Sequence, residues 1–134
     1  MRTIKFRGKR IDKDVFVFGD MLTGMGYKKG KFYILPHQTY YPGDCNSLDG
    51  YEVIPETVGQ FTGLHDADGK EIYEGDIVIF DNHLQGISQV VYDYAGFDVD
   101  SKTYRTALRP MMNNHIRVVG NIYDNPELLK GGAE

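Results

Sequence analysis

One acidic stretch of the chain holds most of the side chains that could do chemistry. Residues 44–81 carry ten acidic side chains against Lys70 alone. Asp66-Ala67-Asp68 begins like a calcium-binding loop, but an EF-hand needs Asp or Asn at the fifth position and Gly at the sixth. Those positions hold Lys70 and Glu71. We therefore interpret the segment as a polar hairpin turn. Asp68-Gly69 predicts type I′, which needs positive φ at both central residues.

Metal and cofactor binding has no motif in this sequence. The histidines are widely spaced and there is a single cysteine, so no zinc-ligand pattern occurs among His37, His65, His83, His115 and Cys45. His65-Asp66 has the composition of a phosphohydrolase metal dyad, but such enzymes need further ligands on helices, which this chain hardly offers. We expect no metal and no cofactor.

Catalysis has equally little support. Glu71, Glu74 and Asp76 are close in sequence, but neighbouring carboxylates are expected by chance in so acidic a segment. A structural role in the turn at Gly75 is the better interpretation. Cys45 has no identified base, and the serines lack a nucleophile-elbow motif. We assign no catalytic residue and expect that the protein is not an enzyme; an enzyme that uses the acidic segment 53–78 is the third hypothesis.

Basic side chains gather in two other stretches. Residues 1–14 hold six Lys or Arg against two acids, and residues 102–117 hold four with no acid. Basic and aromatic side chains on a curved sheet can contact phosphates and stack on bases, so nucleic-acid binding is the second hypothesis. Its candidate surface comprises Lys5, Arg7, Lys9, Arg10, Tyr104, Arg105 and Arg109. The acidic pI of about 5.5 confines such a surface to a local patch, and pairing with the acidic stretch is the competing interpretation.

The elements that position these side chains are predicted to be mainly β. Alternating or β-branched runs between turn residues predict strands at 3–7, 15–20, 31–35, 51–54, 60–64, 70–73, 77–80, 86–93, 97–100, 102–108 and 115–123. Gly120 predicts a bulge in the last of these strands. Helical turns are expected at 55–58 and at 125–129, with Asn125 as N-cap and Pro126 at the first helical position.

Two subdomains account for the spacing of these elements. Residues 1–74 are predicted to form an N-terminal antiparallel β subdomain that includes the segment 53–74. Residues 75–130 place five short strands in about 50 residues, which predicts a small SH3-like, barrel-like antiparallel subdomain with a short C-terminal helical turn. Residues 131–134 are expected to be a frayed tail.

The cellular location is predicted from what the chain lacks. One cysteine allows no internal disulfide, which favours a reducing compartment. The N-terminal stretch has no apolar signal-peptide core, and no apolar run reaches membrane-spanning length. We expect a cytoplasmic protein without a membrane partner.

Three blocks form a distinctive combination: Pro55–Leu64 (PETVGQFTGL), Asp68–Val78 (DGKEIYEGDIV) and Gly120–Leu129 (GNIYDNPELL). Together with Ile4–Arg10 (IKFRGKR) and Phe18-Gly19-Asp20, they resemble the YopX family of phage and prophage proteins over nearly the whole chain. One departure is the absence of a Trp ahead of Gly19-Asp20. The signature positions of structural importance are Gly63, Asp68, Gly69, Tyr73, Gly75, Asp76, Gly120, Asn121 and Pro126.

The resemblance implies an origin and a fold more than a function. It implies a phage or prophage protein with a two-part, mostly β fold, a barrel-like C-terminal half and no established activity. The surplus of apolar and aromatic residues on short strands favours binding. We expect a non-enzymatic accessory protein that acts as a protein-interaction module, either with an unknown protein partner or by self-association; nucleic-acid binding is the alternative.

Overall fold

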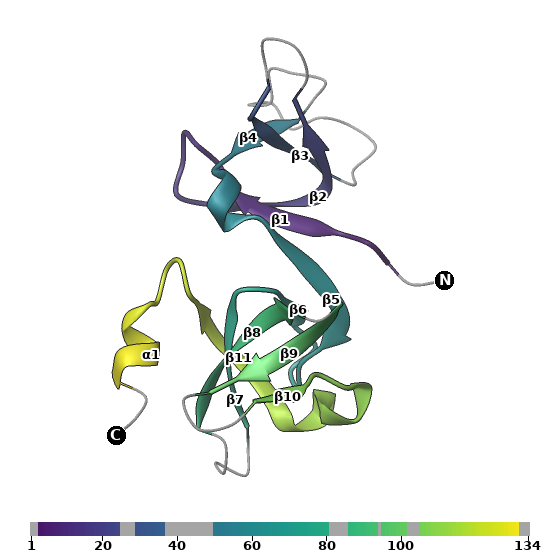
Figure 1. The fold of residues 1–134 in the computed structure, drawn as a ribbon, viewed down its shortest axis with the longest axis vertical. Coiled ribbons are helices and arrows are strands. Elements are labelled where there is room, and N and C mark those ends of the chain that lie inside the picture. The colour runs from purple at the N-terminus through teal and green to yellow at the C-terminus, as the bar shows by residue number, and fades with distance from the viewer. Residues whose placement is uncertain are drawn as a thin grey trace. The chain divides into compact units, whose positions relative to one another are not determined.

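The computed structural model describes residues 3–24, 29–36, 50–80, 86–93, 95–101 and 105–131. Residues 37–49, Tyr104 and residues 132–134 of the predicted tail lie outside these ranges. The described chain is mainly β, as predicted, and divides into two compact units, residues 1–60 (unit 1) and 61–134 (unit 2) (Figure 1). No described helix has the length and apolar character needed to cross a membrane.

The strands of unit 1 belong to a six-stranded antiparallel sheet with the order β4-β3-β2-β1-β5-β6, whose last strand, β6 (Glu71–Tyr73), belongs to unit 2. The elements of unit 1 are β1 (Phe6–Lys9), β2 (Phe16–Thr23), β3 (Phe32–Pro36), β4 (Tyr51–Val53), the 3-10 helix η2 (Pro55–Thr57) and the start of β5 (Gly59–His65). In β1, Arg7 lies opposite Phe18 on one side and Gly59 on the other. Since opposed residues share a face of the sheet, Arg7 and Phe18 project from the same face.

The core of unit 1 is small. Ile34 on β3 and Val53 on β4 are 0% and 1% exposed, and Tyr33 and Tyr51 on the same two strands are also buried. A Cβ added to Gly8 would meet the Val53 side chain at 3.0 Å. This close approach explains why glycine occupies this position of β1. The strand spans residues 6–9 and not the predicted 3–7.

Unit 2 is built on a five-stranded antiparallel sheet with the order β10-β9-β8-β7-β11. Its elements are the end of β5, β6 (Glu71–Tyr73), β7 (Asp76–Phe80), β8 (Ile87–Asp93), β9 (Gly96–Asp100), β10 (Arg105–Ala107), the 3-10 helix η3 (Pro110–His115), β11 (Ile116–Asn121) and α1 (Glu127–Gly131). The register of β11 shifts between Val118 and Gly120, which is the predicted bulge. Within the described ranges β10 pairs with β9 alone and β11 with β7 alone among the strands of this sheet, so the predicted barrel closure is not confirmed.

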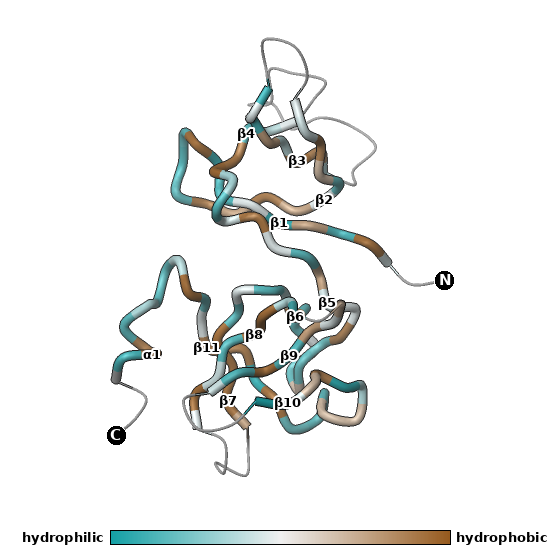
Figure 2. The backbone as a smooth tube through the Cα atoms, viewed as in Figure 1, coloured by the Kyte–Doolittle hydropathy of each residue, from teal (hydrophilic) through white to brown (hydrophobic). Residues whose placement is uncertain are grey.

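A continuous apolar core fills unit 2. Its buried members are Ile72, Val78, Phe80, Val90, Val99 and Ile116, with Leu64, Leu108, Met112 and Val118 packed against them. Hydrophobic stretches coincide with the strands that carry these residues (Figure 2). Ile72 on β6 is a member of this core and Leu64 on β5 packs against it, so both strands contribute to unit 2. The division therefore falls after Gln60, earlier than the predicted boundary at residues 74 and 75.

The turn between β5 and β6 differs from the predicted type I′ turn. Gly69 has a φ of 84°, but Asp68 does not have a positive φ. The Gly69 N–H donates to the Asp66 carbonyl (3.0 Å), and the Asp66 N–H donates to the Lys70 carbonyl (2.8 Å). The physical reason is the Asp66 carboxylate: its Oδ1 accepts the N–H groups of Asp68 and Lys70, both at 2.9 Å, and this side-chain turn keeps Asp68 at negative φ.

Candidate functional site

The predicted basic surface on β1 is largely buried. Arg7, Lys9 and Arg10 are 6%, 7% and 7% exposed, and Lys5 is half-buried. The guanidinium carbon of Arg7 lies 4.6 Å from the centre of the Phe16 ring, and the Lys9 Nζ lies 5.4 Å from it. These cation–π contacts stabilise the β1–β2 hairpin. The side chains predicted to contact phosphates are therefore part of the packing of unit 1.

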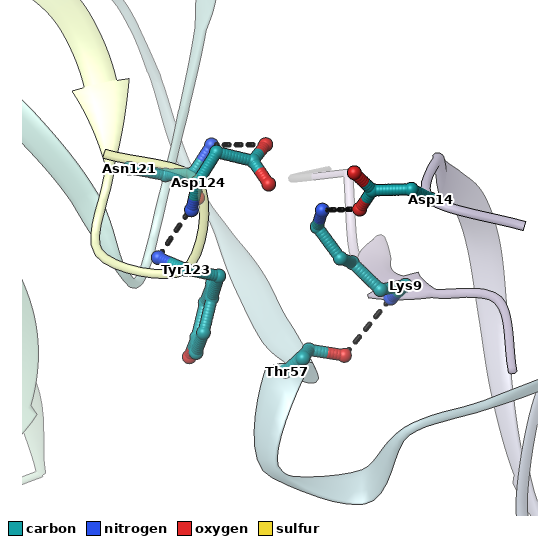
Figure 3. A network of polar contacts seen from close by, with 6 residues as sticks. All are labelled: Lys9, Asp14, Thr57, Asn121, Tyr123 and Asp124. Atoms are coloured by element: carbon teal, nitrogen blue, oxygen red, sulfur yellow. Dashed lines mark hydrogen bonds and ion pairs between the residues drawn. The ribbon is translucent and has the colours of Figure 1, made fainter. Parts of the chain in front are cut away.

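Two of these cations are paired with the turn that joins β1 to β2. Lys9 Nζ forms an ion pair with Asp14, and the Lys9 backbone N–H donates to Thr57 Oγ1 at 2.9 Å (Figure 3). The Arg10 guanidinium donates to both carboxylate oxygens of Asp12, each at 2.8 Å. In these two pairs the acidic partners come from the hairpin itself and not from the acidic stretch 44–81, with which pairing was predicted.

The second predicted basic region is also engaged with acidic side chains. Arg105 donates from Nε to Asp98 Oδ2 (3.1 Å) and from Nη2 to Asp93 Oδ2 (3.0 Å). Desolvation opposes the charge of Arg105, but the hydrogen bond to Asp98 and the nearby acidic charges raise its pKa above the ordinary value. Arg109 is exposed, and Tyr104 lies outside the described residues. Lys5, Arg7, Lys9 and Arg10 belong to unit 1, and Arg105 and Arg109 belong to unit 2.

The acidic stretch contains a buried carboxylate that connects two distant parts of unit 2. Asp66 is 6% exposed, and its Oδ2 accepts the backbone N–H of Val118 at 2.9 Å, across 52 residues of sequence. The next residue, Ala67, donates its N–H to the carbonyl of Ile116 at 2.9 Å. The β5–β6 turn thereby satisfies backbone groups along β11 that do not pair with β7. Covering such groups protects a sheet edge from pairing with other chains.

Asp66 makes the stability of unit 2 depend on pH. Burial disfavours its charged form, but the N–H groups of Val118, Lys70 and Asp68 outweigh that effect and lower its pKa below the ordinary value. The stabilisation is therefore complete above the unfolded-state pKa of about 3.9 and is lost as the pH falls through the lower folded-state pKa.

We expect the urea midpoint of unit 2 to fall between about pH 6 and about pH 3 by more in the natural protein than in an Asp66→Asn variant. The variant lacks the carboxylate that titrates, so equal pH dependence in the two proteins would show that Asp66 does not carry this effect. The measurement is urea unfolding followed by amide exchange, which reports on each unit separately.

The turn that leads into β7 is braced in a similar way. Asp76 is 2% exposed, and its Oδ2 accepts the backbone N–H of Tyr73 at 2.8 Å. Gly75 has a φ of 95°. Its N–H donates to the Val90 carbonyl (2.8 Å), and its carbonyl accepts the Ile122 N–H (2.9 Å). Gly75 and Asp76 thus hold a turn, which is the role preferred from the sequence.

The segment after the β11 bulge forms a compact polar loop. The Oδ1 of Asn121 accepts the N–H groups of Tyr123 (3.0 Å) and Asp124 (2.9 Å) (Figure 3). The Oδ1 of Asn125 accepts the Asn121 N–H at 3.2 Å, so this side chain turns back toward the loop instead of capping α1 as predicted. A Cβ on Gly120 would lie 2.5 Å from that Oδ1, which explains the glycine.

The signature positions lie mostly at turns and bends. Gly63 and Gly69 have φ angles of 89° and 84°, Tyr73 is 2% exposed, and Pro126 is exposed just before α1. Asp66 lies in the predicted hairpin turn, where its side chain accepts the N–H groups of Asp68 and Lys70. Its contact with Val118 was not predicted, because it leaves no local signal in the sequence.

Three carboxylates of the acidic segment accept structural hydrogen bonds. Asp66 and Asp76 accept backbone N–H groups, and Glu71 Oε1 accepts the Tyr73 hydroxyl at 2.8 Å. In the part of the chain that the structure describes, no group of three or more His, Cys, Asp or Glu side chains is arranged to hold a metal ion.

Exposed apolar side chains are concentrated in unit 1. Among the described residues they are Ile4, Ile11, Val15, Phe18, Leu22 and Ile54 in unit 1, and Tyr92, Met111 and Val119 in unit 2. Phe18 and Leu22, 44% and 38% exposed, lie four residues apart on β2 and therefore on one face of the strand. We call the surface formed by these two residues the β2 face. The Phe16 ring lies 6.5 Å from the Phe18 ring and extends this apolar region.

These observations define a mainly β protein of two units, in which Asp66 and Asp76 stabilise turns and Asp66 also contacts β11 at the edge of a sheet. The family described as YopX protein matches residues 5–130, and the chain belongs to this family, which confirms the resemblance found in the sequence. No curated protein matches the chain. In fold, the chain is similar to the crystal structure of protein EF1440 from Enterococcus faecalis, with a TM-score of 0.64 and 21% identity over 96% of this chain and 99% of that chain.

Proposed function

We propose that this YopX-family protein is a non-enzymatic, phage- or prophage-encoded accessory protein of the cytoplasm that works by binding another protein chain through the β2 face. The observation that carries the proposal is the exposure of Phe18 and Leu22, at 44% and 38%, on one face of a strand. Phe18 and Leu22 lie on either side of the exposed Asp20 on this face. Exposed apolar side chains mark interaction surfaces when they gather on one face.

The chemistry of the β2 face favours a second copy as its partner. A two-fold symmetric contact brings the same surface of two copies together, so it can bury Phe18 and Leu22 of both copies at once. Fully burying a large apolar side chain contributes about 1.5–3 kcal/mol, and these two are already more than half buried. Their remaining exposed surface is therefore worth about 1 kcal/mol for each side chain, or about a fivefold change in affinity.

Sedimentation velocity over a range of protein concentrations tests this proposal. The natural protein is expected to form a dimer, and the Phe18→Ser/Leu22→Ser variant to dissociate at concentrations at least tenfold higher. A matched control is Tyr92→Ser/Met111→Ser, which removes exposed apolar side chains from unit 2 and should leave the association unchanged.

An unknown protein partner and nucleic-acid binding, the two alternatives to self-association, are tested with the same proteins. A natural protein that stays monomeric, and that captures no phage or host protein more strongly than the Phe18→Ser/Leu22→Ser variant does, would overturn the proposal. Titration with single- and double-stranded DNA at low salt provides a further arm, in which we expect no binding because the candidate cations Arg7, Lys9 and Arg10 are buried.

A further inference from the structure

The outer edge of β11 carries backbone groups that its pairing with β7 does not use. Val118 donates its N–H to Asp66 Oδ2 at 2.9 Å, and the Ile116 carbonyl accepts the Ala67 N–H at 2.9 Å. The N–H and C=O of one residue in an antiparallel strand point to the same side, and successive residues alternate. Ile116 and Val118 therefore direct these groups away from β7, and Arg117 between them directs its own toward β7. The outer edge is closed by the β5–β6 turn.

The β5–β6 turn covers this edge as a neighbouring strand would. The Ala67 N–H takes the place of a strand donor, and the Asp66 carboxylate takes the place of a strand carbonyl. Residues 67–70 are exposed, and the Asp68 carboxylate lies 3.6 Å from Arg117, with side chains 69% and 59% exposed. Ion pairs as exposed as this one contribute little, so the attachment of the turn to β11 depends chiefly on the two hydrogen bonds.

We propose that the β5–β6 turn is an autoinhibitory strap, which keeps β11 from pairing with the β11 of a second copy of this chain. Release of the strap makes the β11 edge a self-association surface, because a strand edge with uncovered N–H and C=O groups is a template for pairing with another chain. Ile116, Val118 and Val119 are β-branched, which favours extended pairing, and Val119 is 42% exposed. This surface lies in unit 2 and stands independently of the β2 face.

A second copy fits the edge because antiparallel pairing about a two-fold axis is reciprocal. With the axis at Arg117, Ile116 of each copy lies opposite Val118 of the other, so each N–H and C=O directed outward meets its complement. The same arrangement places the two Arg117 side chains opposite each other, and like charges in that position are destabilising. Arg117 therefore opposes self-pairing together with the strap, and removing its charge should favour the pairing.

An Asp66→Asn substitution opens the strap with little change to the turn. The amide oxygen still accepts the N–H groups of Asp68 and Lys70, whereas the amide nitrogen, which is a donor, faces the Val118 N–H. The opposite orientation of the amide is less favourable, because it would break two hydrogen bonds instead of one. The matched control is Asp68→Asn, which changes the charge of the turn equally and leaves both hydrogen bonds to β11 in place.

Sedimentation velocity measures the association, and amide exchange locates it. Both are carried out in the Phe18→Ser/Leu22→Ser background, so that the β2 face does not contribute and the two proposals fail separately. We expect Asp66→Asn to form dimers at concentrations at least about tenfold lower than the background protein, and Asp68→Asn to shift this concentration by less than about twofold. The Val118 amide should exchange rapidly in the dilute Asp66→Asn protein and regain protection as dimers form.

Four results would overturn the proposal. The first is an Asp66→Asn protein that is as monomeric as its background although the Val118 amide exchanges rapidly. The second is a dimer in which that amide stays unprotected, and the third is an association that weakens when Arg117→Gln is added. If the amide stays protected in the dilute protein, Asp66→Ala replaces Asp66→Asn and is judged in the same way. If these variants unfold unit 2, Ala67→Pro removes the other hydrogen bond of the strap, and an Ala67→Pro monomer is the fourth result.

Discussion

Replacing Asp66 with alanine is expected to lower the free energy of unfolding of unit 2 by about 2–4 kcal/mol. The carboxylate accepts three backbone N–H groups at 2.9 Å, from Asp68, Lys70 and Val118, and it is 6% exposed. Alanine leaves these donors without their acceptor in a place that water reaches poorly, and hydrogen bonds to charged groups are the more stabilising ones. The turn should detach from β11 before the core of the sheet unfolds.

Native-state amide exchange measures this effect separately in each unit. Protection should fall most at Val118 and Ala67, and much less in unit 1. The matched control is Asp68→Ala: this side chain is 69% exposed and lies 3.6 Å from Arg117, so its loss should change stability by less than about 0.5 kcal/mol. Equal effects of the two substitutions would show that the turn is stabilised by something other than the Asp66 carboxylate.

Replacing Gly19 with alanine is expected to destabilise unit 1 by about 3 kcal/mol. A Cβ at this position would lie 2.0 Å from the carbonyl oxygen of Leu35 and 2.8 Å from the Cα of Pro36, both backbone atoms of the neighbouring strand. Gly19 is opposite Pro36 in the β2–β3 pairing, so the strands must separate or shift to admit a methyl group. Loss of amide protection in β2 and β3 is the expected observation.

A control for the Gly19 substitution is available in unit 2. Gly96 has no positive φ and no atom within 4 Å of its added Cβ, so Gly96→Ala should change stability by less than about 0.5 kcal/mol. If Gly19→Ala leaves the protection of β2 unchanged, the backbone approach between β2 and β3 is not what requires glycine there.

Local patterns were sufficient to predict most of the elements. The alternating or β-branched runs at 51–54, 77–80 and 97–100 form β4, β7 and β9 within one residue at each end, and Pro55 begins a helical turn as its fixed φ predicts. β1 was displaced because Gly8, a turn signal on its own, is required by the Val53 side chain across the sheet. Barrel closure was not predictable from strand spacing, since spacing does not determine which edges pair.

The candidate surface was less predictable than the fold. Arg7, Lys9 and Arg10 carry charge, and charge alone predicts exposure; their burial depends on Phe16 and Tyr51, which are brought to them by strand pairing. The sequence shows the pairing of opposite charges within this hairpin only as a short run, residues 9–14, that contains both basic and acidic residues. The exposure of Phe18 could not be predicted from the sequence either. The alternation along β2 predicts on which face of the strand a side chain lies, but not whether that face is covered.

Hydroxyl-radical footprinting of side chains tests the role of the β2 face most directly. It is carried out at protein concentrations below and above the one at which sedimentation shows the dimer to form. We expect the oxidation of Phe18 and Leu22 to decrease as the protein associates, while that of Met111 and Tyr92 in unit 2 stays constant. Oxidation of Phe18 and Leu22 that is unchanged by association, or that decreases no more than that of Met111, would contradict this role of the β2 face.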